Sequence, residues 1–98
     1  MAKFDVYPDG EGEYWLDCQS DLLSALNSRL VVPLRNAERY NSSDHRLNPR
    51  FSICGEEWVM LTHFAAAVPA KVLRQPVASL IAQEYEIGRA LDVLIGAY

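Results

Sequence analysis

Residues 51–62 have the sequence Phe51-Ser52-Ile53-Cys54-Gly55-Glu56-Glu57-Trp58-Val59-Met60-Leu61-Thr62. Two apolar segments, 51–54 and 58–62, flank Gly55-Glu56-Glu57, a short loop suited to a β-hairpin. Aromatic and branched side chains favour the half-buried surface of a sheet. Residues 51–62 therefore predict a β-hairpin and an antiparallel sheet.

Three segments upstream of the hairpin also predict strands: residues 3–7, 14–18 and 29–34. The first alternates in polarity and is stopped by Pro8-Asp9-Gly10, a strong turn signal. Pro33 cannot donate a hydrogen bond to a neighbouring strand, so we expect it at a strand end, a bulge or a sheet edge. About five strands and one terminal helix predict a mainly β or α+β fold, a compact sheet or small open barrel.

The connecting segments give weaker signals. Residues 19–28 contain Leu22, Leu23 and Leu26, which fit either a short helical turn or an exposed apolar loop. Residues 36–49 are polar and predict a long loop with short strand pieces at most. Val72 and Leu73 predict a short turn.

The C-terminal segment, residues 76–98, has apolar residues at helical spacing and predicts one helix with a buried face. Its length would be about 34 Å. Pro76 fits the first turn of such a helix, where a missing N–H is harmless. No cap follows its apolar end, so we expect the last turn to fray unless it packs against its own dimer or a partner. The buried stripe is predicted at Val77, Leu80, Ile87, Leu91, Leu94 and Tyr98, with Ile81 and Ile95 beside it.

Composition and charge narrow the class of protein. Half of the 98 residues are apolar and the net charge is −4, which predicts one domain and argues against nonspecific nucleic-acid binding. Residues 29–50 nevertheless carry five arginines against two acids, which fits either a solvated loop or a docking surface for an acidic partner. These arginines are Arg29, Arg35, Arg39, Arg46 and Arg50.

The sequence also bears on location and thiol state. No stretch approaches the roughly 20 apolar residues of a membrane span, and Met1–Asp5 lacks the form of a signal peptide. We therefore expect a soluble, cytoplasmic protein with no membrane partner. Cys18 and Cys54 do not form a Cys-x-x-Cys pair, so we expect two reduced thiols.

Residue patterns typical of catalysis are missing from the sequence. His45 and His63 have no Cys, His or carboxylate at metal-ligand spacing, and the five glycines form no phosphate loop. No nucleophile motif surrounds a serine. Glu56 and Glu57 fit an ordinary acidic turn, and Trp15 and Trp58 fit core positions on strands. These observations predict no enzyme activity, metal or cofactor.

Several segments, in this order and spacing, resemble the CcdB family of bacterial toxins almost from end to end. The resemblance is carried by Phe4-Asp5-Val6-Tyr7, Leu16-Asp17-Cys18-Gln19-Ser20-Asp21-Leu22-Leu23, Arg29-Leu30-Val31-Val32-Pro33-Leu34, Ile53-Cys54-Gly55-Glu56-Glu57-Trp58-Val59-Met60 and Ala67-Val68-Pro69.

The resemblance implies a single toxin domain over residues 1–98, with an SH3-like small barrel of about five antiparallel strands, an accessory small sheet and one C-terminal helix. It implies a homodimer that binds the A subunit of DNA gyrase and traps the cleaved-DNA complex without enzymatic chemistry. It further implies a cognate CcdA-like antitoxin that wraps the toxin and, with the toxin as corepressor, represses their operon. DNA would be contacted only through the antitoxin.

The resemblance and the charge pattern together predict two binding surfaces. An ungapped alignment places Ile95, Gly96, Ala97 and Tyr98 on the family's C-terminal Phe-Trp-Gly-Ile, whose last three residues contact gyrase, and Asp92 on a family asparagine. The predicted gyrase-binding residues are Leu22, Leu23, Asp92, Ile95, Gly96, Ala97 and Tyr98. The five arginines of residues 29–50 are the predicted antitoxin-binding residues.

The altered C-terminus leaves two alternatives open. Because the family tryptophan is replaced, the chain could bind its antitoxin without poisoning gyrase. Other toxins with SH3-like barrels cleave mRNA, so an endoribonuclease is a further alternative that rests on fold-level analogy alone.

Overall fold

The computed structural model describes residues 1–96. Within this range it contains seven strands, four short 3-10 helices and one α-helix. In chain order these are β1 (Asp5–Pro8), β2 (Tyr14–Asp17), η1 (Asp21–Leu23), β3 (Ser28–Asn36), β4 (Arg50–Ile53), β5 (Glu56–Met60), η2 (Thr62–Phe64), β6 (Ala66–Pro69), η3 (Ala70–Val72), β7 (Ala78–Ser79), η4 (Ile81–Gln83) and α1 (Glu84–Ile95).

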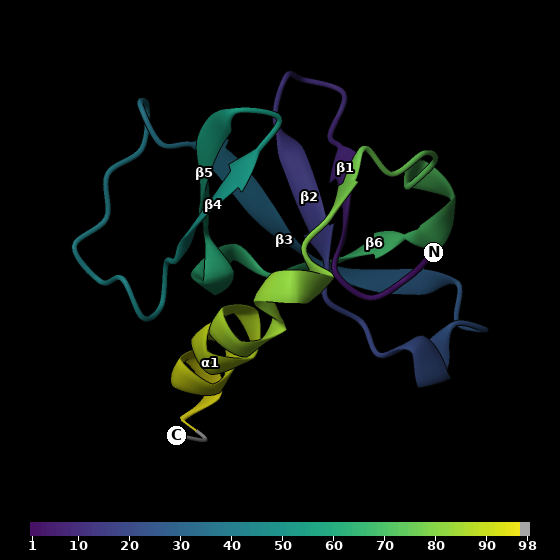
Figure 1. Cartoon of the computed structure of the whole chain (residues 1–98). Helices are drawn as coiled ribbons and strands as arrows, with labels where there is room; N and C mark the ends of the chain where they lie inside the picture. The colour runs from purple at the N-terminus through teal and green to yellow at the C-terminus, as the bar shows by residue number, and fades with distance from the viewer. Residues whose placement is uncertain (97–98) are drawn as a thin grey trace.

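All seven strands belong to one antiparallel sheet, in the order β4-β5-β3-β2-β1-β7, with β6 paired to β3. The long strand β3 pairs with β2 on one side. On its other side, residues 28–31 pair with β6 and residues 34–36 pair with β5. The sheet curls into a nearly closed barrel with α1 at one end (Figure 1). The predicted fold class is therefore confirmed, but the expected accessory sheet is not separate from the main one.

Pro33 lies inside β3, not at a strand end or an outer edge of the sheet. It faces Trp15 on β2, and on its other side it falls in the gap between the β6 and β5 pairings. There its carbonyl accepts a hydrogen bond from Leu61 N–H at 2.9 Å. The missing N–H of proline is tolerated because, on this second side of β3, neither β5 nor β6 is paired with it at Pro33.

Alternation along the strands divides the buried residues between two faces of the sheet. The larger core contains Val6, Leu16 and Val32, and it extends to Ile87 and Ala90 on α1. The next residue on β1, Tyr7, packs with Val31 and Leu73 in a second cluster. This period of two is expected for strands covered on both faces.

The predicted hairpin is confirmed as β4 and β5, but its loop is shorter than predicted. Only Cys54 and Gly55 separate the strands, and both have positive φ, 53° and 84°. Two consecutive left-handed residues form the tight turn that matches the twist of a hairpin. Glu56 and Glu57 therefore belong to β5 and not to the loop.

The prediction of a helix over residues 76–98 is wrong at its start. Val77 N–H and Leu80 N–H donate to the carbonyls of Val6 and Phe4 at 2.8 Å, and between them Ala78 and Ser79 form β7, which pairs with β1. The α-helix begins only at Glu84 and buries Ile87 and Ala90. Leu80 is buried as predicted, whereas Val77 and Leu94 are exposed.

The expectation of an uncapped C-terminal turn is also wrong. Gly96 adopts φ 77°, and its N–H bonds to the carbonyls of Asp92 and Val93. Glycine takes this left-handed conformation without steric cost, so it ends helices frequently. The helix therefore ends at Ile95, with Gly96 as its cap. No helix within residues 1–96 is long and apolar enough to cross a membrane.

The two thiols should react very differently with a disulfide reagent. Cys18 is buried, and burial, with the Asp17 carboxylate adding to the effect, raises the pKa of its thiol to about 12, whereas Cys54 is exposed. Because the thiolate is the reactive form, native protein should titrate one thiol per chain up to pH 10 and two after unfolding. Cys54→Ser should leave none in the native state. Fast native reaction of that variant would contradict the burial of Cys18.

Candidate partner-binding surface

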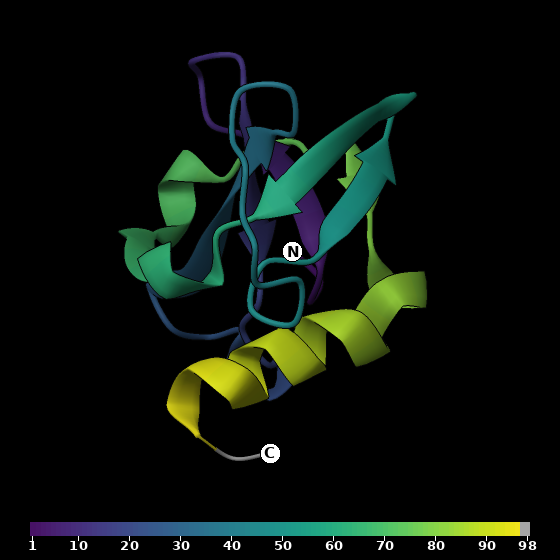
Figure 2. The same cartoon turned by 90° about the vertical axis from the view of Figure 1, so that its left-hand side faces the viewer.

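The described residues of the predicted gyrase-binding surface lie on two separate elements, η1 and the C-terminal end of α1 with its cap. Both elements lie in the lower part of the molecule in two perpendicular views, but in Figure 1 η1 is on the right and the C-terminal end of α1 is on the left (Figures 1 and 2). On η1, Leu22 is 94% exposed and Leu23 is 49% exposed. Leu22 gains almost nothing from burial in its own fold and Leu23 is only half covered, which makes both leucines candidates for a contact with another molecule.

Short-range hydrogen bonds hold the segment that we call the leucine turn, residues 20–24. Ser20 Oγ accepts the N–H of Leu22 at 3.2 Å, and Ser24 N–H donates to the Asp21 carbonyl. Asp21 Oδ1 accepts the N–H of Lys3 at 2.8 Å, which ties the turn to the N-terminus. The open choice between a helical turn and an exposed loop is therefore resolved as both: a 3-10 turn with exposed leucines.

On α1, Asp92 and Ile95 are exposed, Ile95 to 73%, and Gly96 is the helix cap. The helix end projects beyond the strands (Figure 1). Ala97 and Tyr98, also predicted to bind gyrase, lie outside the described residues.

Arg29 does not lie on the surface, so its predicted place on an antitoxin-binding surface is wrong. The side chain is 1% exposed, and its Nε and Nη2 donate to Asp17 Oδ2 at 3.0 and 2.6 Å. Asp17 is itself fully buried. A buried carboxylate needs a cationic partner, and here the arginine supplies it.

The other four arginines remain accessible but are distributed over different parts of the surface. Arg35 pairs with Glu13 at 3.1 Å and with Asp9 at 3.5 Å, while Arg46 and Arg50 each have an acid at 3.9 Å, Asp44 and Glu57. Arg39 is exposed and forms no ion pair within residues 1–96. The long loop that carries Arg39 and Arg46 contains no strand between residues 37 and 49, all of which are described.

The loop is ordered locally by Asp44. Its carboxylate accepts the N–H groups of Leu47 and Arg46, at 3.2 and 3.1 Å. These hydrogen bonds, Leu47 first, lower the pKa of Asp44. Asn48 fixes the end of the loop by donating from Nδ2 to the Met60 carbonyl at 2.9 Å.

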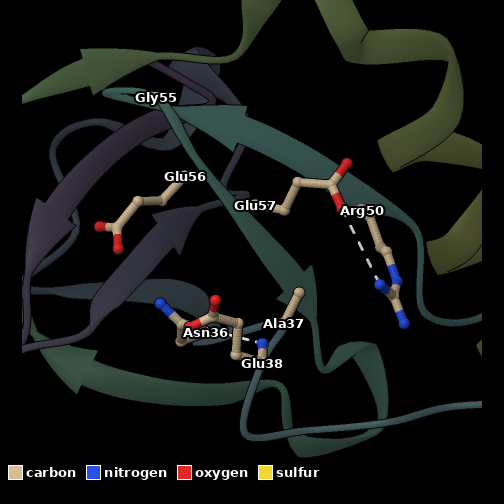
Figure 3. A pocket seen from close by; sticks show the side chains of 7 residues that line it. All are labelled: Asn36, Ala37, Glu38, Arg50, Gly55, Glu56 and Glu57. Atoms are coloured by element: carbon tan, nitrogen blue, oxygen red, sulfur yellow. Dashed lines mark hydrogen bonds and ion pairs between the residues drawn. The ribbon is translucent and has the colours of Figure 1, made fainter.

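A polar hollow of about 330 Å³ lies beside the β4–β5 hairpin (Figure 3). Glu38, Arg50, Glu56 and Glu57 are among the residues that line it. In Figure 3 the side chains of Glu56 and Glu57 point to opposite sides of β5, and Glu57 points toward Arg50. Three carboxylates against one arginine would repel the phosphates of RNA, which does not favour the endoribonuclease alternative.

The hollow and the histidines show no arrangement typical of catalysis. His63 lies against Phe64, with ring centroids 4.5 Å apart, and its Nδ1 is 3.3 Å from Asn48 Nδ2. Within residues 1–96, no three His, Cys, Asp or Glu side chains are placed to hold a metal ion.

Sequence reasoning missed the role of Asp17 and Gln19, which lie in the middle of the segment that carries the leucines. Gln19 is 9% exposed, and its side chain bonds to the backbone of the turn and of β3. The available signal was that Asp17 and Arg29 both belong to apolar segments that predict strands. This pattern indicates a buried ion pair.

Comparison with protein-family models gives one finding that covers nearly the whole chain. Residues 3–96 match the family described as CcdB protein. The match includes every strand, the leucine turn and α1.

Proposed function

The chain belongs to the CcdB family of toxin–antitoxin toxins and gyrase poisons, and from this we propose that it is the toxin of such a pair, which binds the A subunit of DNA gyrase and traps the cleaved-DNA complex. The observation that carries the proposal is the leucine turn, where Leu22 is 94% exposed on a segment fixed by hydrogen bonds. A rigid apolar contact needs little ordering on binding.

The exposed end of α1 supports the same proposal. Asp92 and Ile95 face solvent on the C-terminal end of α1, which lies in the lower part of the molecule in Figure 1, as the leucine turn does. A partner would have to extend across the lower part of the molecule in Figure 1 to contact both elements. The homodimer, which the family implies in general, would bring two copies of both elements into one assembly.

The direct experiment mixes the purified protein with gyrase, supercoiled DNA and ATP, and measures linear DNA released after denaturation. We expect cleaved complexes at micromolar protein or below. A parallel reaction with topoisomerase IV tests whether the effect is specific to gyrase. Absence of cleaved complexes at micromolar protein would remove gyrase poisoning from the proposal.

The second candidate is a protein that binds its antitoxin but does not poison gyrase. It is favoured by Gly96, which ends α1 at the position where the family has the tryptophan that contacts gyrase. Expression in a sensitive bacterium distinguishes the two candidates. Growth arrest supports the toxin, whereas normal growth with tight antitoxin binding supports the second candidate.

For the antitoxin we propose a CcdA-like protein with an acidic segment, which contacts the accessible arginines Arg35, Arg39, Arg46 and Arg50 in the cytoplasm. Together the two proteins would repress their operon, with the antitoxin alone touching DNA. The distribution of these arginines over several elements suits an extended segment better than a compact domain.

Deletion of residues 95–98 should abolish toxicity and leave a folded protein. The deletion starts after the residues of α1 that are buried in the core, Ile87 and Ala90. Circular dichroism and thermal unfolding measure the fold, and growth arrest measures toxicity. If the truncated chain fails to fold, the C-terminal residues are structural, and their assignment to partner binding is wrong.

A further inference from the structure

We propose that Gln19 is a positioning residue for partner binding: it holds the leucine turn in the conformation that presents Leu22 and Leu23. The inference rests on the proposed function, because it assumes that the leucine turn contacts gyrase. It concerns a side chain that is itself 9% exposed and is not expected to touch the partner.

The Gln19 amide links the leucine turn to strand β3. Its Nε2 donates to the Leu23 carbonyl at 3.1 Å, and its Oε1 accepts the N–H of Leu30 at 3.1 Å. Leu23 is the last residue of η1, and Leu30 lies in β3. One side chain therefore attaches the turn to the barrel through both of its polar groups.

Gln19 is in turn fixed by the buried ion pair. Asp17 Oδ1 accepts the N–H of Gln19 at 3.1 Å, while Asp17 Oδ2 holds Arg29. The chain of contacts thus runs from the barrel interior through Asp17 and Gln19 to the carbonyl of Leu23. The ion pair provides a rigid base for the exposed turn.

The arrangement matters because the leucine turn has little packing of its own. None of the three residues of η1 is buried, so apolar contacts do not determine its conformation. An exposed leucine would otherwise gain by folding back onto the surface. Hydrogen bonds from Gln19 oppose that movement, and they lower the entropy that the turn must lose on binding.

The test compares Gln19→Ala with Asn48→Ala. Asn48 is also buried and also donates a side-chain amide to a backbone carbonyl, that of Met60, so it is a matched control for the lost hydrogen bond. We expect Gln19→Ala to bind the gyrase A subunit roughly tenfold more weakly, and Asn48→Ala to change this affinity less than twofold at similar thermal stability. In a Leu22→Ala background the Gln19→Ala effect should shrink, since the turn no longer presents its main contact.

Amide hydrogen exchange provides a readout that does not depend on gyrase. Gln19→Ala should accelerate exchange at Leu23 and Leu26, whose N–H groups bond within the segment, and leave β5 unchanged. Gln19→Glu, which keeps an acceptor for Leu30 but lacks the donor to Leu23, should do the same.

Unchanged exchange at the turn would overturn the positioning role. Accelerated exchange with no gyrase binding by the wild type would refute the proposed function alone. Equal losses of affinity in Gln19→Ala and Asn48→Ala would show a purely structural role.

Discussion

Arg29→Ala is expected to lower the free energy of unfolding by about 3–5 kcal/mol, because it leaves the Asp17 carboxylate buried without its counter-charge. Asp17 is fully buried, and the arginine contacts it through two nitrogens at 3.0 and 2.6 Å. Since small domains are stable by only about 5–15 kcal/mol, much of the folded population would be lost on warming. Urea unfolding followed by tryptophan fluorescence measures the change.

Two further variants test whether the loss of stability comes from the unpaired buried charge or from the removal of the arginine side chain. Arg50→Ala removes an arginine whose partner, Glu57, is 3.9 Å away and largely exposed, so it should change stability by less than about 1 kcal/mol. The double variant Asp17→Leu, Arg29→Met removes both charges and should recover much of the loss. A double variant as unstable as Arg29→Ala would mean that packing, not the unpaired carboxylate, causes the effect.

The features that the sequence predicted well are those determined by neighbouring residues. The hairpin of residues 51–62 and strands β1, β2 and β3 follow from alternation and turn residues within a few positions. The hairpin loop was placed too far along the chain because cysteine at positive φ is uncommon, whereas Cys54 has φ 53°.

The start of the C-terminal helix could not be predicted from spacing. Val77, Leu80 and Ile81 fit a helical stripe, but residues 78 and 79 form β7 instead, between hydrogen bonds from residues 77 and 80 to the carbonyls of Val6 and Phe4. These bonds join residues more than 70 positions apart, and a periodicity within one segment contains no information about them. The spacing does hold from Glu84 onward, where Ile87 and Ala90 face the core.

The residues of the candidate site also differ in how far the local sequence determines their environment. Leu22 and Leu23 were named from the family resemblance, while the local sequence left a helical turn and an exposed loop open. The burial or exposure of the arginines depended on pairing across the sheet. Asp17 lies opposite Val31, two residues beyond Arg29, and this register brings the two charges together. Net charge along a segment cannot distinguish a buried arginine from a surface arginine.

Leu22→Asp should weaken binding to the gyrase A subunit by a factor of about 100 or more, since burying a carboxylate against an apolar surface costs roughly 3 kcal/mol or more. Stability should hardly change, because Leu22 is 94% exposed. Val72→Asp is the matched control: Val72 is an aliphatic residue, 41% exposed, on the 3-10 helix η3. Titration of labelled gyrase A fragment with each variant measures the two affinities.

Measuring how tightly Leu22→Asp binds the antitoxin then tests whether gyrase and the antitoxin contact different surfaces. The accessible arginines lie on β3, β4 and the long loop, not on η1, so the variant should keep its affinity for an acidic antitoxin. Loss of both affinities in a protein that unfolds like the wild type would mean that the two partners share the leucine turn. Gyrase binding equal to that of Val72→Asp would exclude the turn as a gyrase contact, because an aspartate at the centre of an apolar interface cannot be neutral.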